Sequence, residues 1–97
     1  MIIVRNIFQL KFGHAKEAKA LIPEGRQIMK QHGMENARFT TDITGPFYTL
    51  EMELPFESLG AYEKSASETM GTREFSTWYA KFIEHVESGR REIYSVV

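Results

Sequence analysis

The sequence predicts an α+β fold with strands and helices in the order β-α-β-β-α-β. Short segments alternate apolar with polar residues, and the longer segments between them repeat apolar residues at three- and four-residue intervals. Gly33, Gly71 and Gly89 each follow an expected helix, where glycine commonly ends one. This order is typical of a ferredoxin-like fold, an antiparallel sheet with its helices on one face. We expect residues 1–97 to form a single domain, because 97 residues leave no room for two.

The first strand is expected at residues 2–12, where β-branched and aromatic residues alternate with polar ones. A helix follows over residues 15–32, and Gly25 on its apolar stripe indicates a close approach to the surface beneath it. Pro23 removes one backbone donor from this helix and therefore predicts a kink or an early break. Gly33 then supplies the left-handed residue that commonly ends a helix.

Two further strands are expected at residues 36–44 and 47–54, joined by the tight connection "TGP". Pro55 is expected to end the second of them, because proline cannot donate a ladder hydrogen bond.

The second helical region is expected to be split in two. Ser58 is an N-cap for a helix that runs to about Met70, and another helix begins near Thr72. The second helix has the strongest amphipathic pattern of the chain, and Gly89 is expected to close it. The last strand is expected at residues 90–97.

Composition and charge exclude several classes of function. The chain is 42% hydrophobic and 26% charged, as in globular domains, and its net charge of −1 offers no basic field for nucleic acid. The absence of cysteine excludes disulfides and thiolate sites. No segment approaches the roughly 20 apolar residues that cross a bilayer, and the apolar start is too short for a signal peptide. We expect a cytoplasmic protein without nucleic-acid or membrane partners.

Strand alternation assigns the side chains to two faces of the sheet, and the more apolar sets belong under the helices. The other face is charged. Glu51 and Glu53 point the same way there, and nearby Arg5 and Arg38 favour ion pairing over an acid–base pair. The face is compatible with a solvated surface or with an interface to a second copy of the chain. The candidate interface residues are Arg5, Gln9, Arg38, Asp42, Glu51 and Glu53.

Three segments carry a resemblance to a known family: "IVRNIFQLKFGHAKEA", "TDITGPFYTLEMELPFESLGAYE" and "FSTWYAKFIEHVESGRREIY". With the order of strands and helices, they resemble the dimeric α/β-barrel superfamily and, within it, NIPSNAP-type proteins. The resemblance implies a homodimer whose two sheets face each other as a barrel. Its relatives include cofactor-independent monooxygenases, haem-degrading monooxygenases and isomerase-like enzymes, which hold a ligand between the sheet and the helices of each subunit.

Asn6 is the one plainly polar residue on the helix-covered side of the first strand. A buried amide needs partners, so it either bonds to backbone or buried water or lines a pocket as a donor. Aromatic residues of the last helix are compatible with core packing or with a pocket wall. The candidate pocket residues are Asn6, Thr41, Tyr48, Tyr62, Trp78, Tyr79 and Phe82.

We expect no cofactor and no metal site. The haem-degrading relatives combine such an asparagine with a helical tryptophan and an iron-ligating histidine, and Trp78 and His85 do not reproduce that arrangement. The three histidines of the chain show no ligand spacing.

Three functions remain open: a protein that binds a small hydrophobic or aromatic metabolite between sheet and helices, a cofactor-independent monooxygenase-like or isomerase-like enzyme, and a non-catalytic dimeric interaction module with a filled interior. Whether the protein is an enzyme is not decided by the sequence. An RNA-recognition domain shares the strand order, but Asp42, Glu51 and Glu53 on the open face would repel phosphate.

Overall fold

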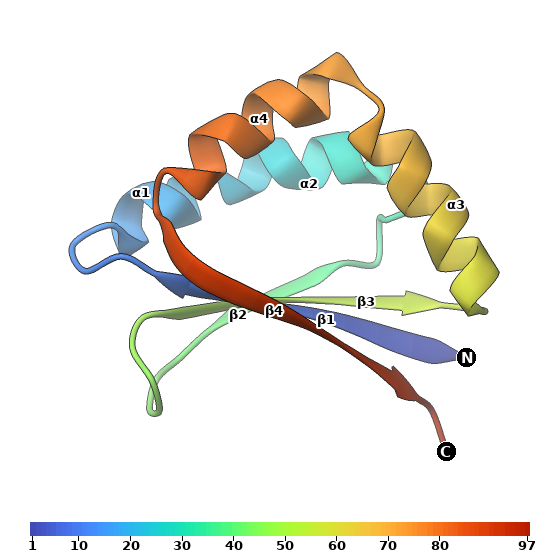
Figure 1. The fold of residues 1–97 in the computed structure, drawn as a ribbon, viewed down its shortest axis with the longest axis horizontal. Helices are drawn as coiled ribbons and strands as arrows, with labels where there is room; N and C mark the ends of the chain where they lie inside the picture. Colours follow the sequence, from blue (N-terminus) through green and yellow to red (C-terminus); the bar gives the residue numbers. More distant parts are fainter.

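The computed structural model describes all 97 residues and shows one antiparallel sheet with its helices on one face (Figure 1). The strands lie in the order β2-β3-β1-β4, so β1 and β3 are central. This arrangement confirms the predicted ferredoxin-like fold, and both helical regions are divided in two. In chain order the elements are β1 (Ile2–Leu10), α1 (Ala15–Ala20), α2 (Ile22–Lys30), β2 (Arg38–Thr41), β3 (Thr49–Phe56), α3 (Leu59–Met70), α4 (Arg73–Ile83) and β4 (Val86–Ser95).

The break predicted near Pro23 lies at Leu21, between α1 and α2. Pro23 stands in the first turn of α2, where a missing backbone N–H costs no helical hydrogen bond. The Leu21 carbonyl accepts a hydrogen bond of 2.8 Å from the indole Nε1 of Trp78, in addition to one of 3.2 Å from the Gly25 amide. Gly33 adopts the left-handed conformation, as predicted, with φ +80°.

Side chains cap both helices of the second helical region. Ser58 Oγ accepts a hydrogen bond of 3.1 Å from the Ala61 amide at the start of α3, which confirms the predicted N-cap. Thr72 Oγ1 accepts one of 3.2 Å from the Phe75 amide and starts α4 in the same way. No helix of the protein has the length and apolar character needed to traverse a lipid bilayer.

Several predicted strand boundaries are wrong, among them the end of the first strand, which lies at Leu10 rather than at residue 12. Pro55 does not end β3, which continues to Phe56. The pairing of β2 with β3 stops at Glu53, so Pro55 lies beyond it and no ladder bond toward β2 is lost. The second strand is also shorter than predicted: β2 covers only Arg38–Thr41, the residues that pair with β3, rather than residues 36–44.

Gly89 does not close a helix, contrary to the prediction. The helix α4 already ends at Ile83, and β4 begins at Val86 with Gly89 inside it. Gly89 pairs with Phe8, and a Cβ at this glycine would lie 3.2 Å from Phe8 Cδ1 and 3.3 Å from the Ile7 carbonyl oxygen. The position therefore favours glycine because two strands and an aromatic ring approach closely there.

Two separate clusters of buried side chains form the core. One lies beneath α3 and the end of α2, and the other beneath α1, α4 and the rest of α2. The strand positions between the clusters are occupied by Asn6 on β1 and Met52 on β3, which face each other in register. The first cluster comprises Val4, Met29, Met34, Ala37, Leu54 and Phe56. The second comprises Leu10, Ala18, Ile28, Leu50, Trp78 and Phe82.

Gly25 brings α2 into direct contact with α4, as its place on the apolar stripe predicted. A Cβ at this position would lie 2.6 Å from Trp78 Cε2 and closer still to Trp78 Cζ2. The indole ring therefore rests on the bare backbone of α2.

We expect Gly25→Ala to lower the free energy of unfolding by about 1–3 kcal/mol, because the added methyl group overpacks the Trp78 contact. Urea denaturation at fixed protein concentration measures the loss. Gly60→Ala is the matched control, since Gly60 is also helical and its Cβ would meet nothing nearer than Ser58 Oγ at 3.8 Å. The control is expected to be neutral or stabilising by up to about 1 kcal/mol, and equal losses in both variants would contradict the close contact.

Candidate functional site

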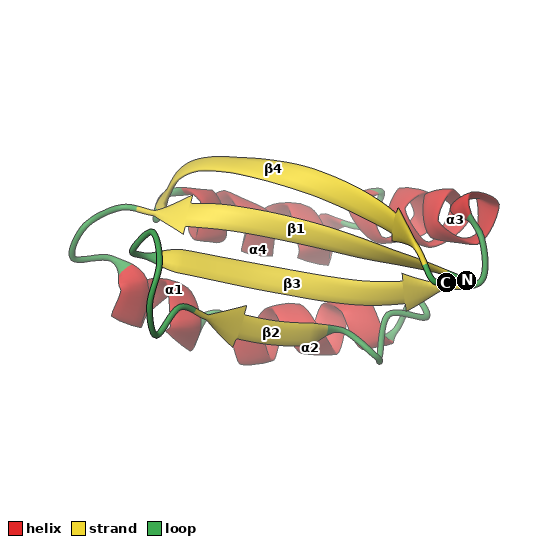
Figure 2. Ribbon diagram, turned by 90° about the horizontal axis from the view of Figure 1, so that it is seen from below, coloured by secondary structure: helices red, strands yellow, loops and turns green.

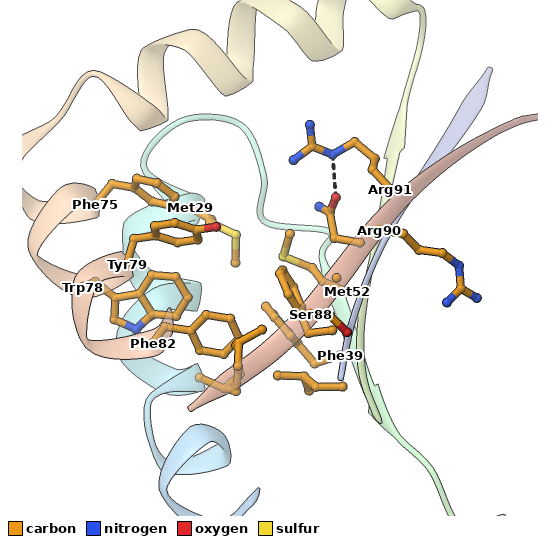
Figure 3. A pocket seen from close by; sticks show the side chains of 16 residues that line it. Met29, Phe39, Met52, Phe75, Trp78, Tyr79, Phe82, Ser88, Arg90 and Arg91 are labelled. Carbon is orange, nitrogen blue, oxygen red and sulfur yellow. Dashed lines mark hydrogen bonds between the residues drawn. The ribbon is translucent and has the colours of Figure 1, made fainter. Parts of the chain in front are cut away.

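A cavity of about 430 Å³ lies between the sheet and helices α2 and α4 (Figure 3). It occupies the gap between the two core clusters, with Phe8, Leu50 and Met52 on the sheet side. Eleven of its sixteen lining residues are hydrophobic. Both its volume and its mainly apolar lining fall within the range of small-molecule sites.

The exposure of the sheet residues agrees with an unfilled interior. Phe8 and Met52 belong to the two central strands and lie under the helices, yet both remain only partly buried. A fully packed core would bury them. The exposed lining residues come from α4 and β4, so the cavity opens between that helix and that edge strand.

Asn6 lies in the wall of this cavity and is 7% exposed. Its Oδ1 accepts a hydrogen bond of 2.6 Å from Nε of Arg91, the residue opposite it on β4 (Figure 3). Its Nδ2 has no hydrogen-bond acceptor within the protein, and no fully buried side-chain nitrogen or oxygen lacks a partner. The Asn6 amide nitrogen therefore keeps access to the cavity as a donor.

Arg91 is the functional candidate that the sequence reasoning missed. The signal lay in the alternation of the last strand, in which Arg91 takes the face opposite to that of Arg90 and Glu92. The Arg91 guanidinium carbon lies 5.8 Å from the centre of the Tyr62 ring. Tyr62 lines a smaller cavity of about 70 Å³, which shares Asn6 and Arg91 with the larger one.

The predicted aromatic wall is present on α4 and serves both core and cavity. Trp78 and Phe82 stack with ring centres 5.1 Å apart, and Phe82 meets Phe8 edge-on at 5.1 Å. Because the Trp78 indole N–H is bound to Leu21, the ring offers the cavity only its apolar surface. Tyr79 is 39% exposed and lies at the opening.

Thr41 and Tyr48 lie outside the lining of the cavity. Thr41 is exposed at the end of β2. Tyr48 precedes β3, and its ring lies 5.6 Å from that of Phe12 and 5.4 Å from that of Phe47. The alternation that predicted an inward Tyr48 begins only at Thr49, because the chain leaves the sheet before that residue.

The fold also brings together two histidines that are far apart in the sequence. Nδ1 of His14, after β1, lies 2.9 Å from Nδ1 of His85, after α4. No group of three or more histidine, cysteine, aspartate or glutamate side chains is placed to hold a metal ion. The two imidazoles thus form a hydrogen-bonded pair at the end of the sheet.

Comparison with solved structures places this architecture among known folds. A NIPSNAP family protein of unknown function from Agrobacterium tumefaciens superimposes with a TM-score of 0.89 at 19% identity, over 96% of this chain and 85% of that one. An uncharacterised NIPSNAP domain protein from Burkholderia xenovorans gives 0.88 at 12% identity, over 100% and 95% of the two chains. The chain has the NIPSNAP fold.

A more distant likeness joins the NIPSNAP fold to a second group. A putative antibiotic biosynthesis monooxygenase from Nitrosomonas europaea superimposes with a TM-score of 0.73 at 13% identity, over 100% of this chain and 99% of that one. No protein-family model and no curated protein matches the sequence. At these identities the comparisons support the fold alone.

Figure 2 shows that the fold leaves the second face of the sheet without helices. The predicted ion pairs lie on this face. Arg5 binds both carboxylate oxygens of Glu51, at 2.9 Å each, and lies 3.8 Å from Glu92. Arg38 binds Glu53 at 3.2 Å. The hydrogen bonds from Arg5 hold the pKa of Glu51 below its usual value, so Glu51 stays ionised near neutral pH and does not serve as a general acid.

Two other candidate interface residues make local contacts. Gln9 Oε1 accepts a hydrogen bond of 3.3 Å from the hydroxyl of Thr49, its neighbour across the open face. Asp42 Oδ1 accepts one of 2.7 Å from the Thr49 amide and thereby closes the connection between β2 and β3. Asp42 follows the last residue of β2, so it lies at the rim of the face.

We expect Glu51→Gln to lower stability at pH 7 by about 1 kcal/mol, because Arg5 loses its charged partner. The pKa of Glu51 is depressed in the folded protein, so its contribution is complete above the ordinary value of about 4.5 and declines as pH falls below it. The difference between parent and variant should therefore shrink as pH is lowered from about 5 toward 2. Urea titrations across this range measure the effect.

Glu53→Gln is the charge-matched control for that experiment. Its partner Arg38 is 70% exposed, so the loss at pH 7 should be smaller. A difference between parent and Glu51→Gln that stays constant down to pH 2 would contradict the assignment.

Proposed function

We propose that this protein is a homodimeric small-molecule-binding protein that holds an apolar or aromatic metabolite between its sheet and helices. The observation that carries the proposal is the cavity of about 430 Å³ that separates the two core clusters. A non-catalytic module with a filled interior would place packed side chains at this position. The partial exposure of Phe8 and Met52 beneath the helices argues against such filling.

The chemistry of the lining favours binding over acid–base catalysis. The cavity wall contains no carboxylate, imidazole or lysine amine that is suited to exchange a proton near neutral pH. Its polar side chains are those of Asn6, Tyr79, Ser88 and Arg91, whereas the guanidinium of Arg90 binds Glu92 on the open face. A few polar groups in an apolar wall orient a ligand, which is the usual arrangement of a binding site.

A neutral aromatic probe tests the cavity directly. We expect 2-naphthamide to bind the parent protein and to shift the indole N–H resonance of Trp78, the single tryptophan of the chain. Met52→Trp should weaken this binding by about tenfold or more, because the larger side chain fills the cavity from the sheet side. Isothermal titration calorimetry measures the affinity.

Leu59→Trp is the matched control for the cavity experiment. Leu59 is 56% exposed at the start of α3 and does not line the cavity, so its replacement should leave the affinity unchanged. Absence of binding to the parent, or equal binding to Met52→Trp, would refute the proposed site.

The dimer is proposed on the open face of the sheet. This face is uncovered in Figure 2, and its three arginines and three glutamates neutralise one another within the subunit. Charges that are already paired cost less to remove from water than isolated ones. A self-complementary face of this kind is suited to a two-fold interface, in which the same patch meets its own copy.

Apolar residues on the open face would supply the driving force for association. Ile3 on β1 pairs with Pro55 on β3 and with Tyr94 on β4, so these three side chains form a row across the face. Tyr94 is 49% exposed. Burial of such a row against a second copy is favourable because it removes apolar surface from water.

We expect light scattering at micromolar concentration to give twice the chain mass of 11.2 kDa. Ile3→Lys should weaken the dimer by at least about tenfold, because it places an unpaired charge in the apolar row. Ile83→Lys is the control, since Ile83 is a 45% exposed apolar residue on α4, away from the open face. A monomeric parent, or equal dissociation of the two variants, would contradict the interface.

A further inference from the structure

Arg91 differs from the other arginines of the sheet in having no acidic partner. Arg5, Arg38 and Arg90 each lie within 4 Å of a glutamate on the open face. The side chain of Arg91 projects from the opposite side of β4, where it contacts Asn6 and the Tyr62 ring. No acidic side chain lines the cavity, so the charge of Arg91 is not neutralised within the protein.

The neighbouring Arg90 does not share this role. Its Nε donates to Glu92 at 2.8 Å on the open face, and Figure 3 shows its guanidinium directed away from the aromatic wall. The two arginines are adjacent in sequence and opposite in direction because side chains alternate along a strand. Arg91 is therefore the single free cation at the cavity.

The orientation of the Arg91 guanidinium is set by two contacts. Asn6 Oδ1 accepts the hydrogen bond from Nε, and the Tyr62 ring lies 5.8 Å from the guanidinium carbon. The two terminal nitrogens have no acceptor within the protein. A held guanidinium with its terminal N–H groups free matches the two oxygens of a carboxylate, and the Asn6 amide nitrogen adds a donor at the same wall.

We propose that Arg91 recognises a carboxylate, and that the cavity binds small monocarboxylic acids with an apolar or aromatic body. This inference rests on the proposed function, since it names the class of ligand for the same cavity. The apolar walls formed by Met52, Trp78 and Phe82 receive the body of the ligand, and Arg91 receives its charge at the opening. Asn6 is a positioning residue, because it holds the guanidinium in place and supplies a secondary donor.

A purely structural role of the Arg91–Asn6 hydrogen bond makes a different prediction. Loss of a structural bond would lower stability and weaken every ligand of the cavity alike. Loss of a cationic group that binds the ligand's carboxylate weakens the binding of anionic ligands selectively, because an amide of the same shape makes no ion pair. The comparison of matched ligands therefore separates the two roles.

The experiment measures the affinities of 2-naphthoate, 2-naphthamide and 2-naphthylmethylamine by calorimetry at pH 7. For the parent protein we expect the carboxylate to bind about tenfold or more tightly than the amide, and the cationic amine to bind weakest. Arg91→Gln should abolish the preference for the carboxylate while the affinity for the amide stays within about threefold. Arg91→Lys keeps the charge and should retain part of the preference.

Arg90→Gln is the matched control, since it removes the same charge one residue away on the opposite face. It should leave the preference intact. Equal affinities of the parent for carboxylate and amide, or an undiminished preference in Arg91→Gln, would overturn the inference and leave the proposed function standing. An equal loss of the carboxylate preference in Arg91→Gln and Arg90→Gln would also overturn it. The overall positive potential of the region, and not Arg91 alone, would then select the ligand. Failure of all three probes to bind the parent would overturn both this inference and the proposed function.

Discussion

The contact between Trp78 and Gly25 is the constraint on which the helical layer depends. The indole ring rests on the backbone of α2, and its N–H is bound to Leu21 at the break between α1 and α2. One side chain of α4 thus joins both segments of the first helical region. Close approach requires glycine, and the Leu21 carbonyl at the break accepts hydrogen bonds from both the indole N–H and the Gly25 amide, so the two features of that region serve the same contact.

The position of the cavity follows from this arrangement. Trp78 and Phe82 pack in the cluster above Leu10 and Leu50. Met29 and Met34 pack with Val4 at the other end of the sheet. The space between these clusters lies over Asn6 and Met52, where the helices contribute no filling side chain. An unfilled cavity of this size lowers the packing energy of the core. Natural proteins keep such destabilising features mainly at functional sites.

Regular patterns in the sequence were sufficient for the order of elements and for the two faces of the sheet. Alternation along residues 2–12 placed Asn6 inward and Arg5 outward, and the structure agrees. The glycine at position 33 was identified correctly because left-handed backbone there depends on local conformation alone. Such features are local, so a single segment contains the information that determines them.

The features that the sequence did not reveal depend on segments that are remote in the chain. Gly89 was taken as a helix terminator, and its actual requirement is the ring of Phe8 on the neighbouring strand. Pro55 is tolerated in β3 because β2 stops short of it. The pairing of Asn6 with Arg91 joins residues 85 positions apart, and no spacing rule connects them. Tertiary contact decided each of these cases.

The distribution of charge over the sheet explains why the carboxylates are a poor guide to the site. Glu51 and Glu53 form ion pairs with Arg5 and Arg38 on the open face, so their charges are already neutralised within the subunit. On the covered face the balance is reversed, because Arg91 lies at the opening of an apolar cavity, beside an amide and an aromatic ring but without an anion. A cation left uncompensated beside an apolar cavity is stabilised when a ligand supplies the missing charge. The unpaired arginine, rather than the paired glutamates, is accordingly the group whose partner has to come from outside the chain.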